Sequence, residues 1–105
     1  MSYSKTAYDA VEPLAPGMHF LRDPLNCETL GVTVIEGSPE WKGLEHDHAE
    51  DGQEEVYLLV EGAGTLEING ESVELTPGVA VRVAPAATRQ LSFHEDSLVV
   101  VAGAT

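Results

Sequence analysis

The sequence lacks the features that mark several large classes of protein. Among its 105 residues there is one cysteine, Cys27, so no disulfide can form within the chain. No apolar run is long enough to span a membrane, and the polar residues 1–5 do not begin a signal peptide. We therefore predict a cytoplasmic protein that has no membrane partner.

Positive charge is also scarce. The chain has 5 lysines and arginines against 18 aspartates and glutamates, which gives a formal net charge of -13. Such a surface repels nucleic acid and anionic lipid, so neither is predicted as a partner. An ordinary acidic domain would fit this composition, but the few lysines and many glutamates favour a halophilic protein with a surface adapted to high salt.

The periodicity of apolar residues points to strands. No segment keeps a helical spacing over ten residues, and short runs rich in β-branched residues alternate with turns. Asn69-Gly70 is a strong signal for a type I′ hairpin turn. This pattern is typical of an all-β sandwich or barrel, with predicted strands at residues 17–21, 29–36, 55–61, 65–68, 73–75, 79–83, 89–93 and 98–101.

Length and composition indicate a single domain. The chain is 43% apolar, which is enough for a real core, and its length leaves no room for a second domain. We predict an N-terminal arm with one short strand over residues 1–28 and a barrel over residues 29–105. Apolar residues on both faces of strand 55–61 predict that it is covered on both sides, by the barrel interior and by a second layer or subunit.

Three side chains form a candidate metal site. His46 and His48 stand two positions apart in an extended stretch at residues 41–48, so they project from the same face. Glu55 lies on the next strand and can close a pocket with them. Two imidazoles and one carboxylate suit a first-row divalent metal.

At this point the sequence resembles a known family, the small single-domain cupins of the conserved-barrel type. His46, His48, Glu55 and Gly62 look like the first cupin motif, and residues 77–89 look like the second. The resemblance covers residues 31–101. It implies a double-stranded β-helix, or jelly-roll barrel, with a pocket at one end, a bound Mn, Fe, Ni or Zn ion, and a homodimer.

The sequence departs from the cupin pattern in two places. Six residues separate His48 from Glu55, a longer gap than the family usually has. Gln53 lies two positions before Glu55 and so shares its face of the strand, which makes it an alternative ligand. The second motif normally ends in a histidine ligand, and the aligned position is Arg89. Arginine cannot bind a metal, because it keeps its proton.

Arg89 therefore leaves the function open between two hypotheses. At about 4 Å and an effective dielectric constant near 20, it would repel a divalent ion by about 8 kcal/mol and attract Glu55 by about 4 kcal/mol before desolvation. One hypothesis is a metal-binding cupin, with or without catalytic activity, in which Arg89 and Tyr57 contact a small anionic molecule such as a carboxylate. The other is a metal-free binding or sensing module in which Arg89 pairs with Glu55. The family includes dioxygenases and isomerases, so the resemblance alone does not choose a reaction.

Overall fold

The computed structural model describes residues 2–105, and nearly all of its regular structure is β-strand. One short 3-10 helix, η1 (Tyr8–Ala10), lies in the N-terminal arm. The prediction of an all-β fold is confirmed. The strands are β1 (Met18–Phe20), β2 (Leu30–Gly37), β3 (Glu54–Glu61), β4 (Gly64–Ile68), β5 (Glu71–Leu75), β6 (Ala80–Val83), β7 (Arg89–Phe93) and β8 (Ser97–Ala104). No helix among residues 2–105 is long and apolar enough to cross a membrane.

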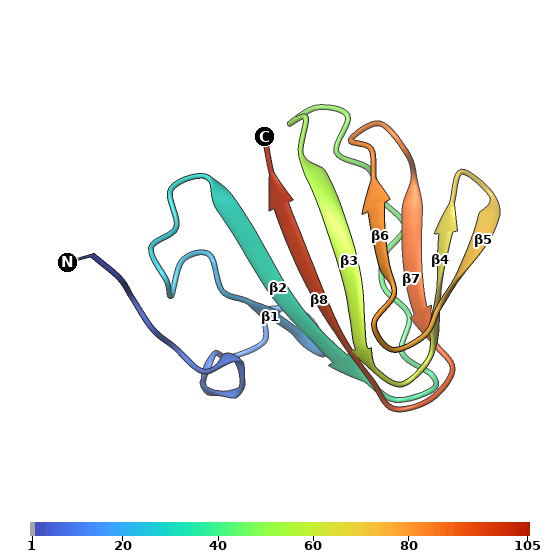
Figure 1. Cartoon of the computed structure of the whole chain (residues 1–105), viewed down its shortest axis with the longest axis horizontal. Helices are drawn as coiled ribbons and strands as arrows, with labels where there is room; N and C mark the ends of the chain where they lie inside the picture. The colour runs from blue at the N-terminus through green and yellow to red at the C-terminus, as the bar shows by residue number, and fades with distance from the viewer. Residues whose placement is uncertain (1) are drawn as a thin grey trace.

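The strands form two antiparallel sheets. Five strands are ordered β1-β2-β8-β3-β6, and the other three are ordered β5-β4-β7 (Figure 1). The C-terminal strand β8 lies in the middle of the larger sheet, between β2 and β3, and pairs with both over most of its length. Strands far apart in the sequence are thus neighbours, which is the arrangement of a jelly roll.

The Asn69-Gly70 turn has the geometry that the sequence predicts. Both residues have a positive φ, 50° and 84°, as a type I′ turn requires. The turn joins β4 to β5 with Ile68 opposite Glu71, and this register places Leu66 opposite Val73.

Alternating side chains build the core between the two sheets. Burial alternates along the whole of β7 and β8, so that one face of each strand is buried and the other is partly exposed. The side chains that are most completely buried include Leu59, Leu66, Leu75, Val83 and Val99. Arg89 is buried among these apolar residues and has 0% exposure.

The extended stretch at residues 41–48 is not a regular strand, which corrects the strand geometry expected for the two histidines. It runs alongside β7 and forms two isolated bridges with that strand, Lys42 with Ser92 and His46 with Arg89. Between these bridges the stretch contains one more residue than β7, so the pairing shifts by one position as in a β-bulge. Such a bulge bends the chain and changes the direction of the following side chains.

Strand β3 has apolar side chains on both faces, but the chain covers only the inner face. Tyr57 and Leu59 are buried, whereas Val56, Leu58 and Val60 on the outer face are 39%, 37% and 42% exposed. No second layer from residues 2–105 packs over this outer face. The predicted cover on that side would have to come from another molecule.

Candidate functional site

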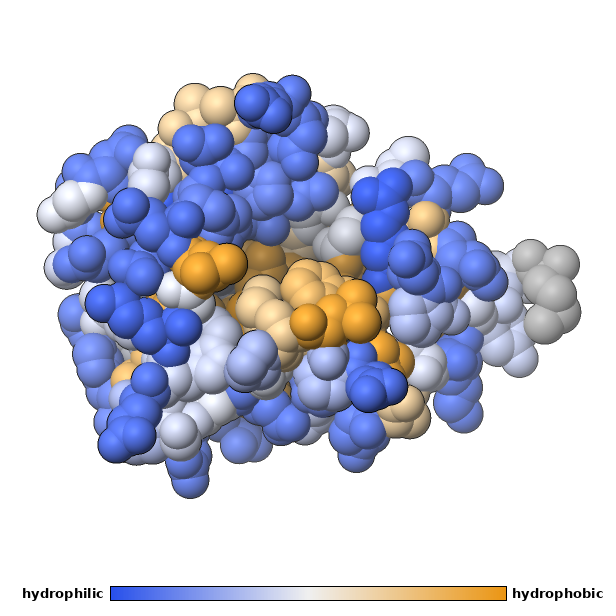
Figure 2. Space-filling view, turned by 180° about the vertical axis from the view of Figure 1, so that it is seen from behind, coloured by the Kyte–Doolittle hydropathy of each residue, from blue (hydrophilic) through white to orange (hydrophobic). Residues whose placement is uncertain are grey.

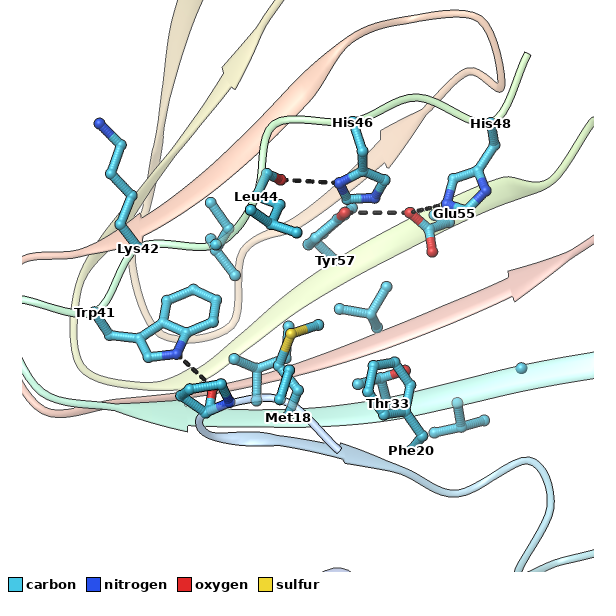
Figure 3. Close-up of a pocket in the computed structure, with 18 of the residues that line it drawn as sticks. Met18, Phe20, Thr33, Trp41, Lys42, Leu44, His46, His48, Glu55 and Tyr57 are labelled. Carbon is cyan, nitrogen blue, oxygen red and sulfur yellow. Dashed lines mark hydrogen bonds and ion pairs between the residues drawn. The ribbon is translucent and has the colours of Figure 1, made fainter. Parts of the chain in front are cut away.

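A cavity of about 900 Å³ lies on the inner side of the larger sheet. Its walls come from β1, β2, β3, β7 and β8 together with the stretch at residues 41–48 (Figure 3). His46, His48, Glu55 and Tyr57 lie together on one side of it, and Trp41 and Met18 lie farther along the wall. This volume is within the usual range for a site that binds a small molecule.

The hydrogen bonds of the two histidines fix which ring nitrogen is free. Nδ1 of His46 lies 3.0 Å from the carbonyl oxygen of Leu44, and Nδ1 of His48 lies 3.1 Å from a carboxylate oxygen of Asp51. A carbonyl or a carboxylate can only accept, so each Nδ1 must carry the proton. In the neutral rings, both Nε2 atoms then keep a free lone pair.

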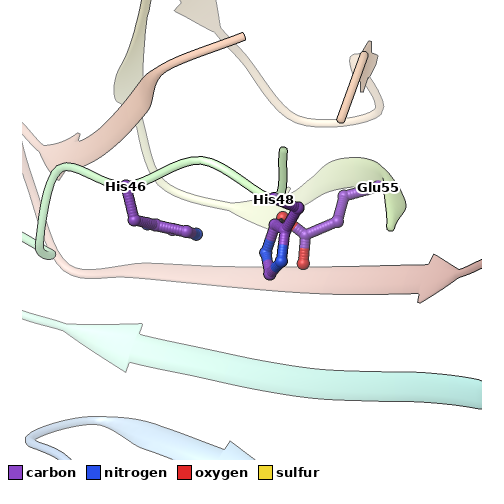
Figure 4. A group of neighbouring side chains, drawn as sticks. All are labelled: His46, His48 and Glu55. Atoms are coloured by element: carbon purple, nitrogen blue, oxygen red, sulfur yellow. Dashed lines mark ion pairs between the residues drawn. The ribbon is translucent and has the colours of Figure 1, made fainter. Parts of the chain in front are cut away.

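The free sides of the two rings face the carboxylate of Glu55. One potential ligand atom from each of His46, His48 and Glu55 lies within 4.8 Å of the others, as Figure 4 shows. Nε2 of His48 is 3.5 Å from Oε1 of Glu55. Two acceptors that face each other at this distance repel unless a positive charge or a donor lies between them.

Glu55 is held from behind by two donors. Nη1 of Arg89 is 3.3 Å from Oε1 of Glu55, and the hydroxyl of Tyr57 donates to the same oxygen at 3.2 Å. The side chain of Glu55 is 12% exposed. Burial raises the pKa of Tyr57 well above its usual range, and the charge of Glu55 raises it further, so Tyr57 stays protonated and keeps donating.

Comparison with solved structures identifies the fold family. No protein-family model matches the sequence, and a search of curated proteins gives no match. A cupin protein from Bacteroides fragilis matches the structure with 25% identity and a TM-score of 0.83, over 100% of this chain and 86% of that one. The chain is a small cupin-type domain.

A sugar phosphate isomerase of the cupin superfamily from Silicibacter pomeroyi has 22% identity and a TM-score of 0.77, covering 97% of this chain and 76% of that one. An RmlC-like cupin from Shewanella frigidimarina has 18% identity and a TM-score of 0.76, covering 99% and 94%. These last two likenesses show the fold alone.

The residues of this cupin domain fit a divalent metal ion with three ligands. Imidazole nitrogens and a carboxylate oxygen are common ligands of first-row metals. In protein metal sites the second ring nitrogen of a histidine ligand usually donates to a carbonyl or a carboxylate, and both His46 and His48 have that partner here. A set of three ligands would leave coordination positions open for water or a small molecule.

Arg89 lies deeper in the cupin domain than the three candidate ligands. Its Nη2 donates to the carbonyl of Ala84 at 2.7 Å, and its Nη1 contacts Glu55. Nε has no hydrogen-bond partner among residues 2–105. Of residues 2–105, those that line the cavity do not include Arg89. It therefore contacts Glu55 from the core side and does not face the cavity directly.

The other predicted site residues lie as follows. Gln53 lines the cavity, where it packs against Gly103 of β8, and it is not part of the group of three candidate ligands. Tyr57 lines the cavity as well, although its hydroxyl is already bonded to Glu55. A histidine outside this predicted set, His94, lies away from the site, where its ring bonds to Thr65.

Two contributions to the site could not be found by sequence reasoning. The longer gap before Glu55 contains Asp51, which binds Nδ1 of His48, and its position three residues after His48 is the only signal of this role. A backbone hydrogen bond from Gln53 lowers the pKa of Asp51, and the bond to His48 lowers it further, so this acceptor stays charged. The second contribution is β1, whose Met18 and Phe20 line the cavity.

Proposed function

We propose that this cupin binds a divalent transition metal, Mn, Fe, Ni or Zn, through Nε2 of His46, Nε2 of His48 and the carboxylate of Glu55. The observation that carries the proposal is the pair of Nδ1 hydrogen bonds, which in the neutral rings leaves both Nε2 lone pairs free beside a largely buried carboxylate. Arg89 and Tyr57 both bond to Oε1 of Glu55, and these two bonds hold the carboxylate beside the two rings.

The charges of the site favour an anionic small molecule. A divalent ion, the Glu55 and Asp51 carboxylates and the Arg89 guanidinium together carry one net positive charge. A bound metal would act as a Lewis acid on an oxygen of this molecule. The protein would hold Glu55 in place, keep Tyr57 protonated and surround the molecule with apolar walls. A carboxylate is the simplest ligand that satisfies this charge.

One observation favours a second candidate function, a metal-free binding or sensing module. Arg89 and Glu55 are both largely buried and their charged atoms are 3.3 Å apart, which is the ion pair expected if arginine replaces the charge of a metal. In this case a positively charged His48 would form a second ion pair with Glu55, whose Oε1 lies 3.5 Å from Nε2. The two functions differ in whether the purified protein takes up metal.

Metal content of the His46→Ala variant tests the proposal. The wild type and the variant would be incubated separately with Mn, Fe, Ni and Zn, desalted, and analysed by inductively coupled plasma mass spectrometry. We expect about one equivalent of at least one of these metals in the wild type and none in the variant, and metal that survives in the variant contradicts the proposed ligand set. His94→Ala is the matched control, because His94 lies outside the site. A wild type that binds none of the four metals would support the metal-free module instead.

We also propose that the protein is a homodimer. The outer face of β3 exposes Val56, Leu58 and Val60, and a second copy of the chain could cover it. Light scattering after size-exclusion chromatography should give twice the mass of 11.2 kDa. Leu58→Lys should give a monomer, whereas Leu14→Lys, at an 81% exposed position in the arm, should not. A monomeric wild type contradicts this proposal.

A further inference from the structure

The walls of the cavity are apolar along most of their length. Met18 and Phe20 come from β1, Ile35 from β2, Leu91 from β7 and Val101 from β8. Figure 2 shows apolar side chains gathered in the middle of one face of the molecule, with hydrophilic residues around them. A molecule bound in the cavity would therefore lose contact with water against hydrocarbon on several sides.

Several polar groups on these walls already bond within the protein or point away from the cavity. Nε1 of Trp41 donates to the carbonyl of Pro16 at 2.7 Å, and the hydroxyl of Tyr57 donates to Glu55. Arg22 donates to the carbonyl of Glu28 at 2.8 Å, and the side chain of Lys42 points away from the cavity in Figure 3. Thr33 and Gln53 are the uncharged lining side chains with no hydrogen-bond partner among residues 2–105. A ligand with many hydroxyl groups would therefore leave most of them without a partner, which is unfavourable in a buried site.

Trp41 makes one wall flat and rigid. Its ring stacks on Phe93 with a distance of 4.9 Å between ring centroids and an angle of 27° between planes. Its hydrogen bond to Pro16 fixes the other edge of the ring. A flat apolar group of a ligand could pack on such a surface without ordering a mobile side chain.

From this arrangement we propose that the cavity selects small molecules with an apolar, preferably aromatic, body and a single anionic oxygen head group. The apolar body lies against the walls formed by β1, Trp41 and Leu91, and the head group lies beside His46, His48 and Glu55. The position of the head group rests on the proposed metal site. The preference for an apolar body rests on the walls alone, and it excludes sugar phosphates as good ligands.

A comparison of three probes tests this preference. Isothermal titration calorimetry would measure binding of 3-phenylpropanoate, propanoate and fructose 6-phosphate to protein loaded with Zn and to protein treated with a chelator. We expect 3-phenylpropanoate to bind at least tenfold more tightly than each of the other two in both forms. The chelator should weaken the binding of both carboxylates, because it removes the charge that holds the head group.

The two parts of this experiment fail independently. The ratio of the affinities for 3-phenylpropanoate and propanoate tests the apolar walls, and the effect of the chelator on these affinities tests the metal site. Fructose 6-phosphate that binds as tightly as 3-phenylpropanoate, or no binding of 3-phenylpropanoate to either form, overturns the inference. A ratio that persists while the chelator has no effect supports the inference and contradicts the proposed metal function.

A pair of variants locates the binding surface. Phe20 lines the cavity from β1 but is not part of the packed core, so Phe20→Ser should leave the fold intact. It should weaken the binding of 3-phenylpropanoate about tenfold, which corresponds to about 1.4 kcal/mol, and leave propanoate unchanged. Tyr3→Ser is the matched control, because Tyr3 is 73% exposed in the arm. Trp41 is the only tryptophan, and its fluorescence should change on binding. An unchanged affinity in Phe20→Ser contradicts the placement of the aromatic body.

Discussion

Among single residues, Arg89 has the largest influence on the charge of the site. It lies directly opposite His46 across an isolated antiparallel bridge, with a backbone hydrogen bond in each direction. Side chains of directly opposite residues point to the same side of a sheet. We therefore expect the Arg89→His variant to place a third imidazole next to His46 and to remove one positive charge. Titration calorimetry with Zn or Mn should show a metal affinity at least tenfold above that of the wild type.

Arg89→Met separates the two causes of this effect. It removes the charge but adds no ligand, and it also removes the donor to Glu55. Its metal affinity should fall between those of the wild type and Arg89→His. Thermal unfolding followed by circular dichroism would show that both variants fold. Equal or weaker metal binding by a folded Arg89→His variant contradicts the idea that Arg89 stands in the place of a missing ligand.

At the scale of elements, the loop before β3 has a structural role in the site. Its Asp51 accepts a hydrogen bond from Nδ1 of His48 and another from the backbone of Gln53. Loss of such a partner typically lowers metal affinity 10- to 100-fold. We expect a loss of this size in Asp51→Ala and a smaller loss in Asp51→Asn, which keeps an acceptor. Glu50→Ala is the control within the same loop, and competition with a chromophoric chelator would measure all of these affinities. A metal affinity of Asp51→Ala equal to that of the wild type would contradict the role of the loop.

The elements that the sequence predicts well are those with a local signal. Alternation of apolar and polar residues predicts β7, and the Asn69-Gly70 turn predicts the hairpin between β4 and β5. The apolar run at residues 98–101 predicts the middle of β8, which extends over Ser97–Ala104. The bulge before His46 has no local signal, because it depends on pairing with β7, which lies more than forty residues later. For the same reason the depth of Arg89 and the contribution of β1 to the cavity require the folded chain.

At the scale of the whole molecule, the few positive charges leave the acidic surface uncompensated. Of the arginines and lysines in residues 2–105, Arg82 pairs with Glu54 and Arg89 pairs with Glu55, and no other lysine or arginine forms an ion pair with a carboxylate. The net charge of -13 therefore repels itself in the folded state. Repulsion between exposed charges is screened beyond about 10 Å at 0.1 M salt and beyond about 3 Å at 1 M salt.

This repulsion predicts a protein that becomes more stable as salt is added, as expected for a halophilic surface. The melting temperature in 1 M NaCl should exceed that in dilute buffer by about 4–8 °C, which corresponds to about 1 kcal/mol for a domain of this size. Replacing three exposed glutamates that form no ion pair, Glu12, Glu71 and Glu95, by glutamine should reduce this salt dependence and raise the melting temperature in dilute buffer. The neutral replacements keep the size of each side chain. A smaller rise of the melting temperature with salt in this variant therefore separates the effect of charge repulsion from the general effect of salt on apolar burial. If the melting temperature of the wild type is the same in dilute buffer and in molar salt, self-repulsion does not limit the stability of this domain.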